Sequence, residues 1–114
     1  MLLGLRHYTP DKWKTTSVWT TPGGRSEVSE TIEATLRREV AEEVGISDMT
    51  VESFLGEVPG VKEGDTVYIF KCQTTQEPQL LEPEKFSEWK WFSLSEIPDD
   101  FINPEVLKVL RNKL

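Results

Sequence analysis

The stretch from Gly23 to Ile46, GGRSEVSETIEATLRREVAEEVGI, contains the features that decide the fold and the chemistry of this chain. At its centre, residues 38–43 have the sequence REVAEE, in a segment whose apolar residues recur with helical spacing. Side chains three and four apart on a helix are neighbours, so Glu39, Glu42 and Glu43 crowd one side and repel one another. Glu39 and Glu43 also border the apolar stripe, where carboxylates are partly desolvated. A hard divalent cation, Mg²⁺ or Mn²⁺, would relieve the repulsion, because it takes carboxylate oxygens as ligands.

Both ends of this helix are marked in the sequence. We expect it to start at Ser29 or Glu30, with Ser29 as the N-cap. We expect it to end at Val44, because Gly45 suits the left-handed residue that closes a helix. Before the helix, residues 22–24 are Pro-Gly-Gly, which predicts a turn where backbone carbonyls or amides can point at a ligand. The alternative for this turn is a plain tight turn with no ligand.

Composition favours a single soluble domain that spans residues 1–114. The net charge of −7 argues against a general nucleic-acid or anionic-membrane binder, because both of those partners attract basic surfaces. The only cysteine, Cys72, cannot form an internal disulfide, and the sequence has neither a long apolar run nor a signal-peptide pattern. We therefore expect a cytoplasmic protein.

The rest of the chain alternates β-forming segments with turn signals and ends in an amphipathic helix. Asn103 is the predicted N-cap of that last helix, and Pro104 occupies its first position. The strands are predicted at residues 1–6, 17–21, 49–58, 65–73 and 88–92.

The central stretch matches a family motif at every fixed position. Gly24 is followed after five residues by Glu30, and then after seven residues by the run Arg38-Glu39-Val40-Ala41-Glu42-Glu43-Val44-Gly45-Ile46. This pattern is the Nudix box, and the chain resembles the Nudix hydrolase family. The resemblance also includes residues 2–6, the approach Trp19 to Gly24 and residues 88–98, so it covers nearly the whole chain. It implies an α/β fold in which a mixed sheet is sandwiched between helices (α/β/α) and the box forms a loop–helix–loop.

The resemblance also implies a chemistry. Family members hydrolyse a nucleoside diphosphate linked to another group, with Mg²⁺ or Mn²⁺ as the cofactor. By this resemblance Glu39 and Glu43 are principal metal ligands, and Glu42 is a further ligand or the base for the attacking water. A main-chain carbonyl of Gly23 or Gly24 completes the metal site. Metal ions would let an acidic protein hold a pyrophosphate, because they neutralise its charge and lower the pKa of bound water.

Residues outside these ligands support the site. Arg38 resembles a residue that holds a box carboxylate by charge-assisted hydrogen bonds, and Glu30 belongs to the same outer layer. Many family members use one more carboxylate from a later loop, for which Glu82, Glu84 and Glu88 are candidates and Glu84 is favoured. A solvated acidic loop explains these three residues equally well. The predicted catalytic residues are Arg38, Glu42, Glu43 and Glu84, and the predicted metal ligands are Gly24, Glu39, Glu42 and Glu43.

The substrate is expected to be a small-molecule nucleotide. The later part of the chain resembles the MutT-like branch, which hydrolyses (modified) purine nucleoside triphosphates to a monophosphate and pyrophosphate. Arg6, Gly23 and Asn103 are the predicted substrate-binding residues, although a helix cap explains Asn103 as well as reading a purine edge does. One alternative is the same chemistry on ADP-ribose or a nucleotide sugar. Another is a nucleotide-sensing module without catalysis, against which the intact acidic set argues.

The chain departs from the family pattern at its start. Family members carry a further strand before the one that matches residues 2–6, and this sequence has no room for it. Either the true start lies upstream, or the strand is absent and its neighbour's edge is exposed or paired with another subunit. Because an open apolar edge invites association, we expect a homodimer or reduced stability.

Overall fold

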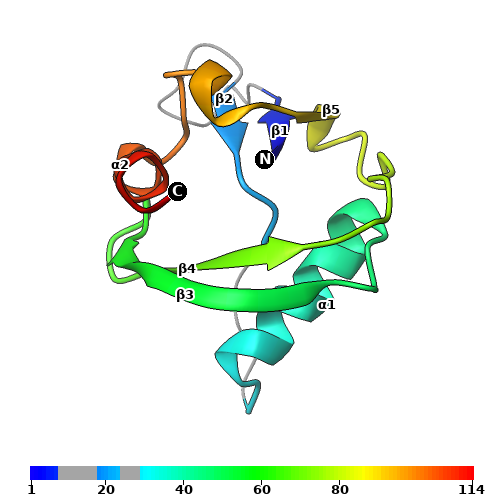
Figure 1. Ribbon diagram of the computed structural model, residues 1–114, viewed down its shortest axis with the longest axis horizontal. Coiled ribbons are helices and arrows are strands. Elements are labelled where there is room, and N and C mark those ends of the chain that lie inside the picture. Colours follow the sequence, from blue (N-terminus) through cyan, green and yellow to red (C-terminus); the bar gives the residue numbers. More distant parts are fainter. Residues whose placement is uncertain (8–17, 24–28) are drawn as a thin grey trace.

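Two antiparallel sheets and two helices make up the described part of the computed structural model, residues 1–7, 18–23 and 29–114 (Figure 1). The predicted strands and helices are all present, and their ends lie within three residues of the predicted ones. No helix in these ranges is both long and apolar enough to cross a membrane. The elements are β1 (Leu2–Arg6), β2 (Val18–Thr20), α1 (Ile32–Val44), β3 (Thr50–Pro59), β4 (Thr66–Gln73), β5 (Phe86–Trp91), the 3-10 helix η1 (Leu94–Glu96) and α2 (Pro104–Lys113).

The strands form two separate sheets. In the first sheet β1 lies in the middle and pairs antiparallel with β2 on one side and β5 on the other. In the second sheet β3 pairs antiparallel with β4. One isolated parallel bridge joins Trp19 to Phe101, so the expected mixed sheet is present in two parts with mostly antiparallel pairing.

Neighbouring residues of β1 pack into different cores. Leu3 is fully buried with residues of α2, and Leu2 packs with residues of α1. Consecutive side chains of a strand point to opposite faces, so α1 covers one face of this sheet and α2 the other. The predicted layering of helix, sheet and helix is confirmed. The α2 core contains Leu3, Val58, Ile69, Phe101, Val106, Leu107 and Leu110, and the α1 core contains Leu2, Val40, Val44 and Ile46.

Helix α1 begins later than predicted. Its N-cap is Thr31, whose Oγ1 accepts a hydrogen bond from the backbone N–H of Ala34 at 3.1 Å. Ser29 was the wrong cap, because it lies two residues earlier in the left-handed region, with φ of 74°. The predicted end is correct, since Gly45 has φ of 71° and donates its N–H to the carbonyl of Ala41.

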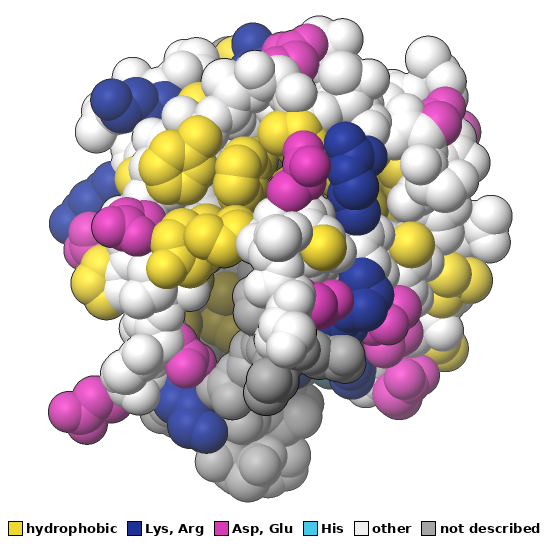
Figure 2. Space-filling model, turned by 90° about the horizontal axis from the view of Figure 1, so that it is seen from below, with side chains coloured by type: hydrophobic (Ala, Val, Ile, Leu, Met, Phe, Trp, Pro, Cys, Tyr) yellow, Lys and Arg dark blue, Asp and Glu magenta, His cyan; other side chains and the backbone are white. Residues whose placement is uncertain are grey.

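A cavity of about 950 Å³ lies between the two sheets. It is lined by residues 65–74, which include β4, by apolar side chains of α1 and α2, and by Met1 and Leu2 at the start of the chain. Figure 2, seen from below, shows hydrophobic side chains grouped near a hollow on that face. Both edges of β1 are paired, with β2 and with β5, so the open edge that we expected beside residues 2–6 is not found in the described ranges. In the second sheet β3 and β4 each have one edge without a partner strand.

Candidate active site

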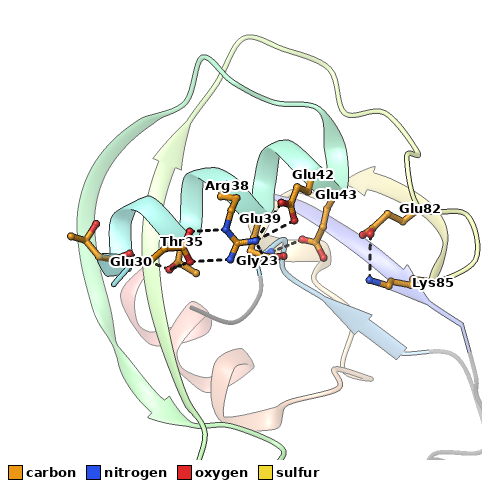
Figure 3. Close-up of polar contacts among 10 residues, drawn as sticks. Gly23, Glu30, Thr35, Arg38, Glu39, Glu42, Glu43, Glu82 and Lys85 are labelled. Atoms are coloured by element: carbon orange, nitrogen blue, oxygen red, sulfur yellow. Dashed lines mark hydrogen bonds and ion pairs between the residues drawn. The ribbon is translucent and has the colours of Figure 1, made fainter. Parts of the chain in front are cut away.

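The guanidinium of Arg38 lies at the centre of a group of carboxylates on α1 (Figure 3). Its Nε and Nη2 donate to the two carboxylate oxygens of Glu30, at 2.6 and 3.0 Å. Its Nη1 donates to Glu39 at 2.6 Å and to Glu42 at 3.2 Å. The hydroxyl of Thr35 also donates to Glu30, at 3.1 Å. This geometry matches the role that the sequence suggested for Arg38, because the planar guanidinium orients several carboxylates at once.

These contacts correct the sequence argument about repulsion. We expected Glu39, Glu42 and Glu43 to repel one another, and the contacts of Arg38 with Glu39 and Glu42 reduce that repulsion for these two. The reason is local geometry, since Glu39 follows Arg38 directly and Glu42 lies one helical turn further on. The single positive charge of Arg38 does not neutralise Glu30, Glu39 and Glu42 together, so the site keeps an excess of negative charge around Glu43.

Glu43 is the buried carboxylate of the site, with 8% of its surface exposed. Its Oε1 accepts a hydrogen bond from the backbone N–H of Gly23 at 2.7 Å. Burial raises the pKa of Glu43 to about 7, against the opposing effect of the Gly23 hydrogen bond. The negative charges of Glu39 and Glu82 raise this pKa further, and the positive charge of Lys85 lowers it. Folding thus places Glu43 where a nearby cation would favour its ionised form.

Of the three later carboxylates, Glu82 is the one that acts on Glu43. Figure 3 shows Glu82 and Lys85 across from Glu43, and Lys85 Nζ donates to Glu82 Oε2 at 3.3 Å. Glu84 is exposed, and Glu88 lies exposed in β5 opposite Leu5. A role for Glu84 stays a prediction. The spacing of Glu82 and Lys85, three residues apart in a turn, is the sequence signal that could have favoured Glu82.

The predicted substrate-binding residues lie at separate places. Gly23 contacts Glu43, and Gly24 lies outside the described residues. Arg6 is exposed at the end of β1, with its guanidinium carbon 5.8 Å from the centre of the Phe86 ring.

Asn103 has the contacts of a structural cap. It is 7% exposed, and its Oδ1 accepts from the backbone N–H of Glu105 at 3.0 Å. Its Nδ2 donates to the carbonyl of Pro59, also at 3.0 Å. These bonds confirm the predicted cap of α2, and the purine-reading role stays a prediction.

The donor set around Glu43 fits a hard divalent cation in kind. All of the candidate ligands are oxygen donors, and Glu43 is a carboxylate whose burial and acidic neighbours oppose its charge. A bound cation would remove that penalty. Within residues 1–7, 18–23 and 29–114, however, no three acidic, histidine or cysteine side chains already converge as a metal cage. The large cavity adjoins this site, because Gly23 and Thr35, which contact Glu43 and Glu30, line it, although none of the box carboxylates does.

Comparisons with known proteins agree with this arrangement. Residues 1–112 match the family model described as the NUDIX domain. No curated protein was found to match the chain by sequence.

Several solved structures share the fold. A MutT NUDIX hydrolase from Burkholderia pseudomallei is 23% identical, with a TM-score of 0.76, and the alignment covers 99% of this chain and 87% of that one. A C. elegans Ap4A hydrolase is 21% identical, with a TM-score of 0.75 and coverage of 97% and 81%. A MutT protein from Methanosarcina mazei Go1 is 23% identical, with a TM-score of 0.70 and coverage of 98% and 80%.

The family model covers almost the whole sequence, and it includes the helix that carries Arg38, Glu39, Glu42 and Glu43. The fold predicted from the sequence is confirmed by the structural likeness. The chain therefore belongs to the Nudix family.

Proposed function

We propose that this protein hydrolyses a purine nucleoside triphosphate, normal or modified, to the monophosphate and pyrophosphate, with Mg²⁺ or Mn²⁺ as cofactor. The observation that carries the proposal is Glu43, a buried carboxylate that receives a hydrogen bond from Gly23 and lies near the charges of Glu39 and Glu82. A bound cation would stabilise the ionised form of such a carboxylate, and an acidic protein needs that cation to hold a polyphosphate.

Each acidic residue has a proposed task. Glu39 and Glu43 would hold the cation with a main-chain carbonyl of Gly23 or Gly24, and Glu42 would be a further ligand or the base. The cation, when bound, neutralises phosphate charge and makes water more acidic. Glu82 takes the task that the sequence suggested for Glu84, because its charge acts on Glu43.

Arg38 keeps Glu39 and Glu42 oriented through its hydrogen bonds, while its contact with Glu30 fixes the guanidinium itself. This task is proposed from charge-assisted geometry, which sets both distance and direction. The side chain would act by holding ligands and not by touching the substrate.

The preference for a triphosphate rests on resemblance to MutT-like proteins, and MutT proteins share this fold. The same chemistry on a linked nucleotide such as ADP-ribose or a nucleotide sugar is the second candidate. A Nudix module that binds nucleotide without hydrolysis is the third. We also propose that the protein acts in the cytoplasm, since its single cysteine, Cys72, suits a reducing compartment.

The test is a turnover screen with Mg²⁺ over nucleoside triphosphates, 8-oxo-dGTP, ADP-ribose and nucleotide sugars. Glu43→Gln is run beside the parent, and Arg37→Ala is the matched control on the same helix. We expect turnover of a purine triphosphate that releases pyrophosphate, that Glu43→Gln abolishes and that Arg37→Ala retains. Two monophosphates from a linked substrate would favour the second candidate. Nucleotide binding with no turnover on any substrate would favour the third.

A further inference from the structure

His7, the only histidine of the chain, holds the turn that carries Glu82. Its backbone N–H donates to the carbonyl of Lys85 at 2.9 Å. Its ring Nε2 lies 3.0 Å from the carbonyl oxygen of Pro83. A carbonyl oxygen only accepts hydrogen bonds, so the ring nitrogen must be the donor. His7, which follows β1, therefore forms hydrogen bonds with two carbonyl groups of one turn.

The turn itself is tightly bonded. The backbone N–H groups of Lys85 and Phe86 both donate to the carbonyl of Glu82 at 3.0 Å. The Lys85 ammonium also pairs with the Glu82 carboxylate. Phe86, the next residue, is 1% exposed and anchors the chain in the core. Held by Phe86 at one end and by His7 from the side, the turn has little freedom to move Glu82.

This turn directs the Glu82 side chain towards Glu43 (Figure 3). Figure 3 shows the Glu82 and Glu43 carboxylates facing each other, one from the turn and the other from α1. Like charges separate unless something holds them in place. Lys85 offsets part of the charge, and the two hydrogen bonds of His7 hold the backbone.

We propose that His7 is a positioning residue, which fixes the turn of residues 82–85 so that Glu82 faces Glu43 as an additional carboxylate of the metal site. This inference rests on the proposed function, since it assumes that Glu43 helps to hold a cation. Both the neutral ring protonated at Nε2 and the imidazolium can donate the hydrogen bond to the Pro83 carbonyl.

The experiment measures Mn²⁺ affinity by electron paramagnetic resonance of free Mn²⁺, with turnover as a second readout. The variants are His7→Leu, His7→Gln, Glu82→Gln and the double variant His7→Leu with Glu82→Gln. Leucine lacks the ring donor, whereas the amide of glutamine replaces it at a similar reach. All four retain the backbone N–H of residue 7, so the ring contact is tested separately. Thermal unfolding of each variant is recorded beside the affinity.

We expect His7→Leu to raise the Mn²⁺ Kd by about tenfold, the lower end for groups that orient ligands, and His7→Gln to stay within about twofold of the parent. Glu82→Gln should weaken binding at least as much. In the Glu82→Gln background, His7→Leu should add nothing, because residues that act through one another are not additive.

Three results would overturn the inference while the parent binds Mn²⁺: an unchanged Kd for His7→Leu, failure of His7→Gln to restore binding, or full additivity with Glu82→Gln. A parent that binds no Mn²⁺ would overturn both this inference and the metal dependence of the proposed function. A parent that binds Mn²⁺ but turns over no substrate would contradict the proposed function alone. The Mn²⁺ affinities of the variants would still test the role of His7.

Discussion

At the scale of single residues, the burial of Glu43 predicts how stability depends on pH. Its folded pKa is about 7, raised from the ordinary value of 4.5. Between these values the folded protein retains a proton that the unfolded chain has lost, so stability falls as pH rises through this window. The contribution is complete below 4.5 and is lost above about 7, where the loss approaches about 3 kcal/mol.

Glu43→Gln tests this dependence. Glutamine retains an oxygen for the N–H of Gly23 but cannot ionise, so the variant should not lose this contribution. We expect metal-free parent and variant to differ little near pH 4.5, and the variant to become the more stable one above pH 7. Urea unfolding at several pH values, with a chelator present, measures both curves. Parallel curves throughout would contradict the assignment, and added Mg²⁺ should stabilise the parent more than the variant.

Arg38 supports a second prediction at this scale. Lysine keeps the positive charge but cannot form the forked contact with Glu30 while also bonding Glu39 and Glu42. We expect Arg38→Lys to reduce metal-dependent turnover by about 10- to 100-fold, as for other groups that orient ligands. Steady-state kinetics with a Mg²⁺ titration measures the effect. Arg37→Lys is the control, because Arg37 bonds the Met49 carbonyl and an exposed Glu33 instead. Equal losses in both variants would contradict a special role for Arg38.

The sequence could predict which residues form the acidic site but only in part how their environments differ. Helical spacing places Glu43, and not Glu42, beside the apolar stripe, and the structure agrees, since Glu43 is buried and Glu42 is exposed. Spacing does not say that Glu43 lies deeper than Glu39, which borders the same stripe. Among Glu82, Glu84 and Glu88 the sequence favoured Glu84, and it could not show that Glu82 begins a turn bonded to His7.

At the scale of elements, the start of α1 depends on a choice between two capping residues. Ser29 and Thr31 are both good N-caps by type, and an acidic residue follows Ser29 directly. The structure selects Thr31, because Glu30 is drawn away from the helix end to bond Arg38 eight residues later. Local sequence patterns do not include a contact at that distance. This explains why the helix end at Gly45, a purely local feature, was predicted correctly.

Removing each hydroxyl separates the two caps. We expect Thr31→Ala to lower the free energy of unfolding by about 1 kcal/mol, because the N–H of Ala34 loses its acceptor. Ser29→Ala should change it by less than about 0.5 kcal/mol, as for surface positions without such a bond. Urea unfolding at a pH where Glu43 is protonated keeps that titration from masking the difference. A larger effect at Ser29 would restore the sequence-based assignment.

At the scale of the whole molecule, the large cavity between the two sheets is what the sequence could not reveal. Its walls come from β4, α1 and α2, which are far apart in the chain, so their separation depends on packing and not on any local pattern. Protein interiors are normally close-packed, and a hollow of about 950 Å³ is large for a chain of 114 residues. The sequence led us to expect an open edge beside residues 2–6, and this expectation was wrong, because β5 from the later part of the chain pairs with β1 opposite β2.

The open edge of β4 leads to the last prediction, which concerns self-association. Unpaired strand edges recruit further strands, and Tyr68 on β4 adds an apolar side chain with 39% of its surface exposed. We expect the protein to form dimers as its concentration rises, and Tyr68→Lys to weaken them, because a charged edge discourages pairing. Sedimentation velocity over a concentration series measures both. Leu80→Lys is the matched control, since Leu80 is also exposed but lies outside the strands. If association depends on the β4 edge, only Tyr68→Lys should shift the protein to monomer. Equal shifts in both variants would indicate nonspecific apolar association. A parent that is monomeric at every concentration would contradict the prediction.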